Sequence, residues 1–106
     1  MNAVSMVQNN GESDMADVTI RIYFRDQAGM VEDGSQDYSL TDFAGFLPAI
    51  GDTIVDPGVL QGLDRTEPQN RDVWKVVDRI FNPRDMADYV VLVVEERKGT
   101  EADTWL

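Results

Sequence analysis

Alternation of apolar and polar residues is clearest near the start of the chain. From Val18 to Phe24 the even positions are all apolar, while the odd positions are polar or amphipathic and include Arg21 and Arg25. A period of two is typical of a β-strand with one buried face. The pattern predicts a strand over residues 17–25, and the Asp26–Gly29 sequence predicts a turn after it.

Two longer apolar runs lie near the end of the chain. Residues 72–81 and 89–96 are rich in β-branched and aromatic residues, which favour strands. Asn82 and Pro83 between them are suited to begin a single helical turn. We therefore predict a long antiparallel hairpin. Residues 89–94 are apolar on both faces, which is typical of a central strand covered on both sides or placed in a curled sheet.

The middle of the chain has weaker signals. Residues 37–40 and 52–55 predict short strands, and residues 32–35 and 56–58 predict turns. Thr41 and Asp42 are placed to cap a short helical turn through residues 43–46, which Pro48 and Gly51 keep short. Residues 62–70 predict a polar loop.

These elements together predict a mainly β protein. We expect a small curled antiparallel sheet or a partly open five-stranded barrel, with one or two short helical turns. A meander with one short helix, an α+β arrangement, is the alternative. The predicted organisation is a mobile N-terminal tail over residues 1–16, a single β-rich domain over 17–98 and a C-terminal tail over 99–106. Trp105 and Leu106 are expected to pack on the sheet rather than form an exposed docking end.

Composition excludes several kinds of chemistry. The 106 residues include no His and no Cys, so there is no His-based catalytic triad, imidazole or thiolate metal ligand, or disulfide. Residues 33–37 resemble the start of a calcium loop, but Tyr38 and Ala44 stand where an EF-hand needs Gly and Glu. Lys75 is expected in a surface ion pair rather than as a nucleophile, and no glycine-rich phosphate loop is present. We expect no enzyme activity, no cofactor and no metal.

The N-terminal residues lack the basic region of a signal peptide, and the longest apolar run, residues 89–94, is far shorter than the ~20 residues that cross a bilayer. A soluble cytoplasmic protein is therefore expected. Its formal net charge of -11 repels phosphates and anionic membranes, so no direct nucleic-acid or membrane partner is expected.

This charge is concentrated in the centre of the chain. Residues 26–64 contain eight acidic residues and no Lys or Arg, whereas residues 71–98 are electrically neutral. One interpretation is that Asp accumulates in turns, where its side chain caps backbone groups, and that the charge serves solubility. The other is that these loops form an acidic face for a basic partner.

The aromatic residues have two interpretations as well. Phe24, Trp74, Phe81 and Tyr89 occupy strand positions and are expected in the core. Phe43 and Phe46 lie among the acidic residues, where core packing is favoured and a partner-facing anchor is the alternative. The candidate partner-binding residues are Asp26, Glu32, Asp33, Asp37, Asp42, Phe43, Phe46, Asp52, Asp56 and Asp64.

The leading hypothesis is a non-enzymatic binding module or inhibitor whose acidic face over residues 26–64 meets a basic protein surface, as in a nucleic-acid-binding site. In size, acidity and lack of catalytic residue types the chain is similar to inhibitors of nucleic-acid enzymes, such as phage anti-defence proteins. That similarity is compositional and transfers no residue. The alternative is an assembly module that oligomerises through its sheet edge, with the protein a monomer or a small homo-oligomer. A small carboxylate-dependent enzyme is the third hypothesis.

Overall fold

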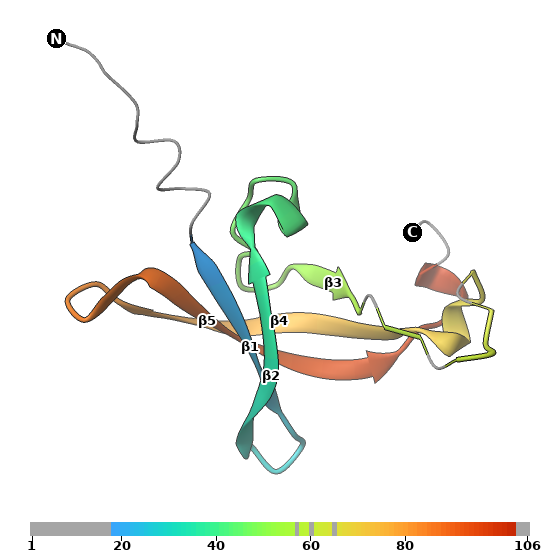
Figure 1. The fold of residues 1–106 in the computed structure, drawn as a ribbon. Coiled ribbons are helices and arrows are strands. Elements are labelled where there is room, and N and C mark those ends of the chain that lie inside the picture. The colour runs from blue at the N-terminus through green and yellow to red at the C-terminus, as the bar shows by residue number, and fades with distance from the viewer. Residues whose placement is uncertain (1–17, 57, 60, 65, 104–106) are drawn as a thin grey trace, which may run out of the picture.

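Five strands form one open sheet in the computed structural model, which describes residues 18–56, 58–59, 61–64 and 66–103. The strands are β1 (Thr19–Arg25), β2 (Val31–Ser39), β3 (Thr53–Val55), β4 (Asp72–Asn82) and β5 (Met86–Lys98). Three short 3-10 turns complete the described elements: η1 (Leu40–Phe43), η2 (Pro68–Asn70) and η3 (Glu101–Asp103). The spatial order is β2-β1-β5-β4-β3, which leaves β2 and β3 at the edges (Figure 1).

The predicted mainly β fold is confirmed, and the sheet does not close into a barrel. The strand pairing is mixed rather than wholly antiparallel. The β1–β2 and β4–β5 hairpins are antiparallel, but β1 runs parallel to β5 and joins the two hairpins through residues 19–24 and 89–94. Local patterning predicts the β4–β5 hairpin, whereas for residues 26–40 it predicts only turns and a short strand. It also does not determine which strand of one hairpin lies beside which strand of the other.

One side of the sheet, here called the core face, carries the hydrophobic core. Ile20, Ile22, Trp74, Leu92 and Val94 are fully buried on it. The segment between β2 and β3 folds over this face. Its Leu40 is buried, and its Phe43 and Leu47 pack against the core. The side that carries Arg21, Tyr23 and Glu95 is called the opposite face.

Strand β5 is central, as its apolar sequence predicts. Leu92 and Val94 belong to the core face, and Val93, which points the other way, is also buried with 4% of its surface exposed. The β4–β5 hairpin extends beyond the rest of the sheet (Figure 1). The expected core position of Phe81 is wrong, because Phe81 is 53% exposed and lies on β4 beyond residues 73–75, the part of β4 that pairs with β3.

The connections differ from prediction in detail. The link between β4 and β5 is a turn over residues 83–85 rather than a helical turn. The side chain of Asn82 accepts a hydrogen bond from the Asp85 amide at 3.3 Å. The predicted helical turn near residues 43–46 begins earlier, as η1. Asp42 lies within it and accepts a hydrogen bond from the Ser39 amide at 2.8 Å.

Strand β2 begins at Val31 and continues through residues 32–35, the segment predicted to be a turn. Gly34 and Ser35 have no partner on β1, because Ile22 pairs with Gln36 and Tyr23 pairs with Asp33. Ser35 has a left-handed backbone with φ of 56°. The turn-forming residues therefore produce a β-bulge within a continuous strand instead of a loop between strands.

The folded domain continues past residue 98. The Gly99 amide donates to the Arg71 carbonyl oxygen at 2.8 Å, and Asp103 is buried beside Arg97. The predicted tail over residues 1–16 and the predicted packing of Trp105 and Leu106 lie outside the described residues. Among the described residues no helix is long and apolar enough to cross a membrane.

Candidate functional site

The acidic residues of the strands divide between the two faces of the sheet. Strand register places Glu32 opposite Phe24 and Glu96 opposite Trp74, so both belong to the core face. Asp33 lies opposite Tyr23 and Asp37 lies opposite Arg21, on the opposite face. The acidic block seen in the sequence is therefore split by the alternation of β2.

On the opposite face, arginines pair with Asp33, Asp37 and Glu95. Arg21 Nε is 2.8 Å from Asp33 Oδ1, Arg21 Nη2 is 2.9 Å from Asp33 Oδ2, and Arg21 Nη1 is 3.1 Å from Asp37 Oδ1. Hydrogen bonding to Arg21 lowers the pKa of Asp33, and hydrogen bonding to both carboxylates raises the pKa of Arg21. Arg25 forms an equivalent pair with Glu95 at 2.8 Å. Two arginines thus pair with three carboxylates on this face.

The core face carries a line of aromatic rings. Phe24 meets Trp74 edge-to-face with ring centroids 5.4 Å apart. Tyr38 lies 6.5 Å from Trp74 and 5.6 Å from Phe43. These separations are in the range of favourable aromatic pairs. Residues from β1, β2, β4 and η1 thus form a continuous aromatic floor across the sheet.

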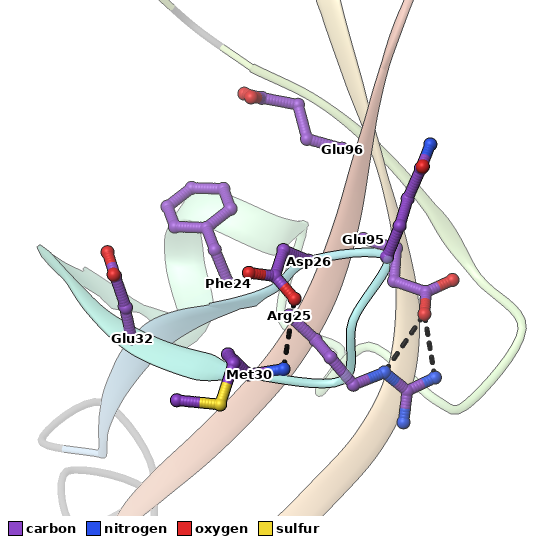
Figure 2. A pocket seen from close by; sticks show the side chains of 8 residues that line it. Phe24, Arg25, Asp26, Met30, Glu32, Glu95 and Glu96 are labelled. Atoms are coloured by element: carbon purple, nitrogen blue, oxygen red, sulfur yellow. Dashed lines mark hydrogen bonds and ion pairs between the residues drawn. The ribbon is translucent and has the colours of Figure 1, made fainter.

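Several hollows lie along this floor. The first, here called the Phe24 hollow, has a volume of about 510 Å³ (Figure 2). Its lining consists of Phe24, Arg25, Asp26, Gln27, Met30, Glu32, Glu95 and Glu96. Its one arginine already pairs with Glu95, so the hollow carries a net negative charge.

A second hollow, about 350 Å³, lies beside Tyr38 and is lined by Asp42, Phe43, Ile54 and Trp74 among others. The Tyr38 hydroxyl donates to Gln36 Oε1 at 2.6 Å. Burial, followed by the nearby charges of Asp56 and Asp42, raises the pKa of Tyr38. Both carboxylates are thus near enough to Tyr38 to disfavour a negative charge on its phenol.

Phe43 and Phe46 have different environments. Phe43 packs against the core and Tyr38, as the favoured interpretation predicts. Phe46 is 75% exposed and lines a smaller hollow with Pro48 and Asp52. An exposed aromatic ring among acidic residues is suited to contact a partner.

Most loop aspartates also have a local structural role. Asp26 accepts hydrogen bonds from the amides of residues 28 and 30. Asp52 accepts one from the amide of residue 49, and Asp56 accepts one from the amide of residue 58. Asp64 accepts from the Thr66 amide and hydroxyl, which lowers its pKa. These contacts explain why Asp is used in the turns. They leave the negative charge of each carboxylate in place.

The structure brings seven of the ten candidate residues to the hollows of the core face: Asp26, Glu32, Asp42, Phe43, Phe46, Asp52 and Asp56. Asp33 and Asp37 are on the opposite face with Arg21, and Asp64 closes a turn. Asp72 and Glu96, which line hollows on the core face, were missed because the C-terminal hairpin is neutral overall. Asp72 is two residues from Trp74, and Glu96 is two residues from Val94. Because alternate residues of a strand share a face, this spacing could have placed both carboxylates on the core face.

We use the name acidic surface for the carboxylates of the core-face hollows together with the exposed ring of Phe46. Its members are Asp26, Glu32, Asp42, Asp52, Asp56, Asp72, Glu96 and Phe46. Arg25 and Lys98, the cations that line these hollows in the described part of the chain, are each paired with a carboxylate. The acidic surface therefore keeps an excess of negative charge.

Three of these carboxylates come close together. One oxygen each from Asp56, Asp72 and Glu96 lies within 4.8 Å of the others, a spacing that could hold a cation. Lys98 Nζ is 3.1 Å from Asp72, and the Trp74 indole N–H donates to Glu96 Oε2 at 3.2 Å. Protein donors thus already contact two of the three carboxylates. The cluster links the Phe24 hollow to the hollow beside Asp72.

The comparisons with known proteins gave no match: no family model, curated protein sequence or solved structure matches the chain. Function is therefore argued from the surface itself.

Proposed function

We propose that this protein is a non-catalytic binding module that presents its acidic surface to a basic surface of a partner protein. A lysine- and arginine-lined groove of a nucleic-acid enzyme is one such surface, and occupying it would inhibit the enzyme. The acidic residues would then take the place of nucleic-acid phosphates.

The segregation of charge between the two faces carries this proposal. On the opposite face, Arg21 and Arg25 form ion pairs with Asp33, Asp37 and Glu95. On the core face, Glu32, Asp42, Asp56 and Glu96 take part in no ion pair with any described residue. If acidic residues served only solubility, no separation by face would be needed. An unneutralised acidic face instead steers and orients a basic partner.

The assembly alternative receives less support from the sheet edges. The β2 edge carries Glu32, Asp33 and Asp37 and is interrupted by the bulge at Gly34 and Ser35. The β3 edge has only three residues. Charge, bulges and short length all discourage edge-to-edge pairing of sheets.

The proposal is tested by binding to a basic probe, a 20-residue peptide of alternating arginine and glycine. The D42N/D52N/D56N variant removes three charges, while each Asn keeps a side-chain oxygen to accept the local backbone hydrogen bond. We expect about a tenfold loss of affinity in this variant and a comparable loss when salt screens the wild-type protein. Binding is measured by calorimetry at 50 and 500 mM NaCl.

The matched control is D85N/D88N/E101Q, which removes three exposed charges that line none of the described hollows. This control should bind the peptide nearly as well as the wild type. Equal losses in both variants would show that total charge, and not the acidic surface, governs binding. Affinity that does not change with salt would also contradict the proposal.

A further inference from the structure

The Phe24 hollow combines an aromatic wall with carboxylates that are not equivalent. Arg25 and Glu95 pair with each other, and both are directed toward the opposite face (Figure 2). Phe24, Glu32 and Glu96 belong to the core face. The hollow thus has a neutral pair at one side and two carboxylates without ion pairs at the other.

Strand register holds these two carboxylates on either side of the ring. Glu32 is directly opposite Phe24 on β2, and Val94 is opposite Phe24 on β5. Glu96 is two residues beyond Val94, so it points to the same side of the sheet. Adjacent strands are about 4.8 Å apart, and residues at i and i+2 are about 6.6 Å apart. A side chain lying on Phe24 would therefore be within reach of both carboxylates.

The position of the ring is fixed by its neighbours. Phe24 packs edge-to-face on the buried Trp74, and it lies so close to Gly34 that a Cβ built there would be 2.5 Å from Phe24 Cε2. Met30, 66% exposed, supplies a flexible apolar wall at the mouth. Phe24 thus gives the hollow a fixed side, and Met30 gives it a side that can adapt to a ligand.

These features match the chemistry of an arginine side chain. Guanidinium is planar, stacks on aromatic faces and offers a fork of N–H donors to carboxylates, whereas a lysine ammonium is a compact, strongly hydrated charge. We infer that the Phe24 hollow accepts an arginine side chain of the partner, stacked on Phe24 and hydrogen-bonded to Glu32 and Glu96. This inference rests on the proposed function and names the group that the acidic surface recognises.

The test uses three small probes, N-acetyl-arginine amide, N-acetyl-lysine amide and N-acetyl-citrulline amide, titrated into the full chain and followed by NMR. Citrulline keeps the shape of arginine but lacks its charge. We expect arginine amide to bind most tightly and to shift the resonances of Phe24, Glu32 and Glu96. The E32Q/E96Q variant should weaken arginine amide binding about tenfold, because it removes both charged acceptors.

The matched control is D85N/D88N, which removes two exposed charges far along the β4–β5 hairpin. It should leave arginine amide binding unchanged. F24L, checked for folding by circular dichroism, should reduce the preference of arginine over lysine because the stacking surface is lost. Equal affinity for arginine and lysine in the wild type, or equal losses in E32Q/E96Q and the control, would overturn the inference.

The two proposals fail in different ways. If the Arg-Gly peptide binds with salt dependence and D42N/D52N/D56N weakens it, but E32Q/E96Q has no effect, the acidic surface stands and the arginine hollow is wrong. If no basic peptide binds with salt dependence, the proposed function fails, and with it the inference that depends on it.

Discussion

Arg97 and Asp103 hold the end of the described chain against β5. Arg97 donates to both carboxylate oxygens of Asp103, at 2.9 and 3.1 Å, and the Thr100 amide donates to Asp103 Oδ2 at 2.7 Å. Asp103 is buried despite its charge. A bidentate pair with an added backbone donor satisfies the carboxylate, so this acid has a structural role that differs from those of the acidic surface.

The Arg97 hydrogen bonds, followed by the Thr100 amide, lower the pKa of Asp103 from its ordinary value of 3.8. A carboxyl group whose pKa is lower in the folded state adds stability above its unfolded pKa, and that stability is lost as the pH falls through the folded pKa. Wild-type stability should therefore decrease below about pH 3.8, and D103N should be less stable at pH 7 and show a smaller decrease. Urea unfolding from pH 7 to pH 2 measures both. E101Q, on the same turn, is the control, and an unchanged pH profile in D103N would contradict this role.

Among the elements, β2 contributes carboxylates to both faces of the sheet, and its bulge lies next to them. Gly34 and Ser35 form the bulge, and the Asp33 side chain accepts the Ser35 amide at 2.8 Å. Within one stretch of β2, Glu32 faces the Phe24 hollow while Asp33 turns to Arg21. The strand therefore supplies one carboxylate to the acidic surface and one to the opposite face.

Gly34 is required here by a close approach. An added Cβ would be 2.5 Å from Phe24 Cε2 and 2.8 Å from the Ile22 carbonyl oxygen. Gly34→Ala should reduce the free energy of unfolding by roughly 1–3 kcal/mol, because the Ile22 backbone cannot move aside easily. Gly58→Ala is the control, since its Cβ would meet only Asp56 Oδ1 at 3.4 Å. Urea denaturation should show a loss for the first variant only, and equal stabilities would contradict the close packing.

In the whole molecule, the sheet has one face on which arginines pair with carboxylates, one acidic surface, an acidic β2 edge, and a second edge where β3 covers only residues 73–75 of β4. The β2 edge is acidic, so two copies would place like charges beside each other. Large exposed apolar side chains lie on the β4–β5 hairpin, as Ile80, Phe81 and Met86 do, and also elsewhere, as Met30, Phe46 and Ile50 do. Under the proposed function, the charge of the β2 edge and of the acidic surface favours a basic partner over a second copy of the chain.

We therefore expect the protein to be a monomer at neutral pH. Sedimentation equilibrium should give the chain mass of 11.9 kDa up to high micromolar concentration and at both low and high salt. A monomer would agree with the binding-module proposal. A concentration-dependent dimer whose interface includes β2 would support the assembly alternative instead.

Much of the fold could be predicted because its signals are local. The even-numbered apolar residues from Val18 to Phe24 predict β1, and the β-branched run at 89–94 predicts a central strand. The bulge was read as a turn because Gly34 and Ser35 have the same turn preference in either setting. Phe81 was placed in the core because its sequence shows a strand but does not show where the neighbouring strands end.

The sequence by itself determined the β class, the C-terminal hairpin, the absence of histidine and cysteine chemistry, and the amount of negative charge. These properties follow from composition and from contacts between residues near each other in the chain. The tertiary structure alone decided which acids share a surface. The parallel pairing of β1 with β5 brings Glu32 and Glu96 to either side of Phe24, and alternation along β2 directs Asp33 to Arg21. Such grouping depends on strand order and register, which are set by packing between distant segments.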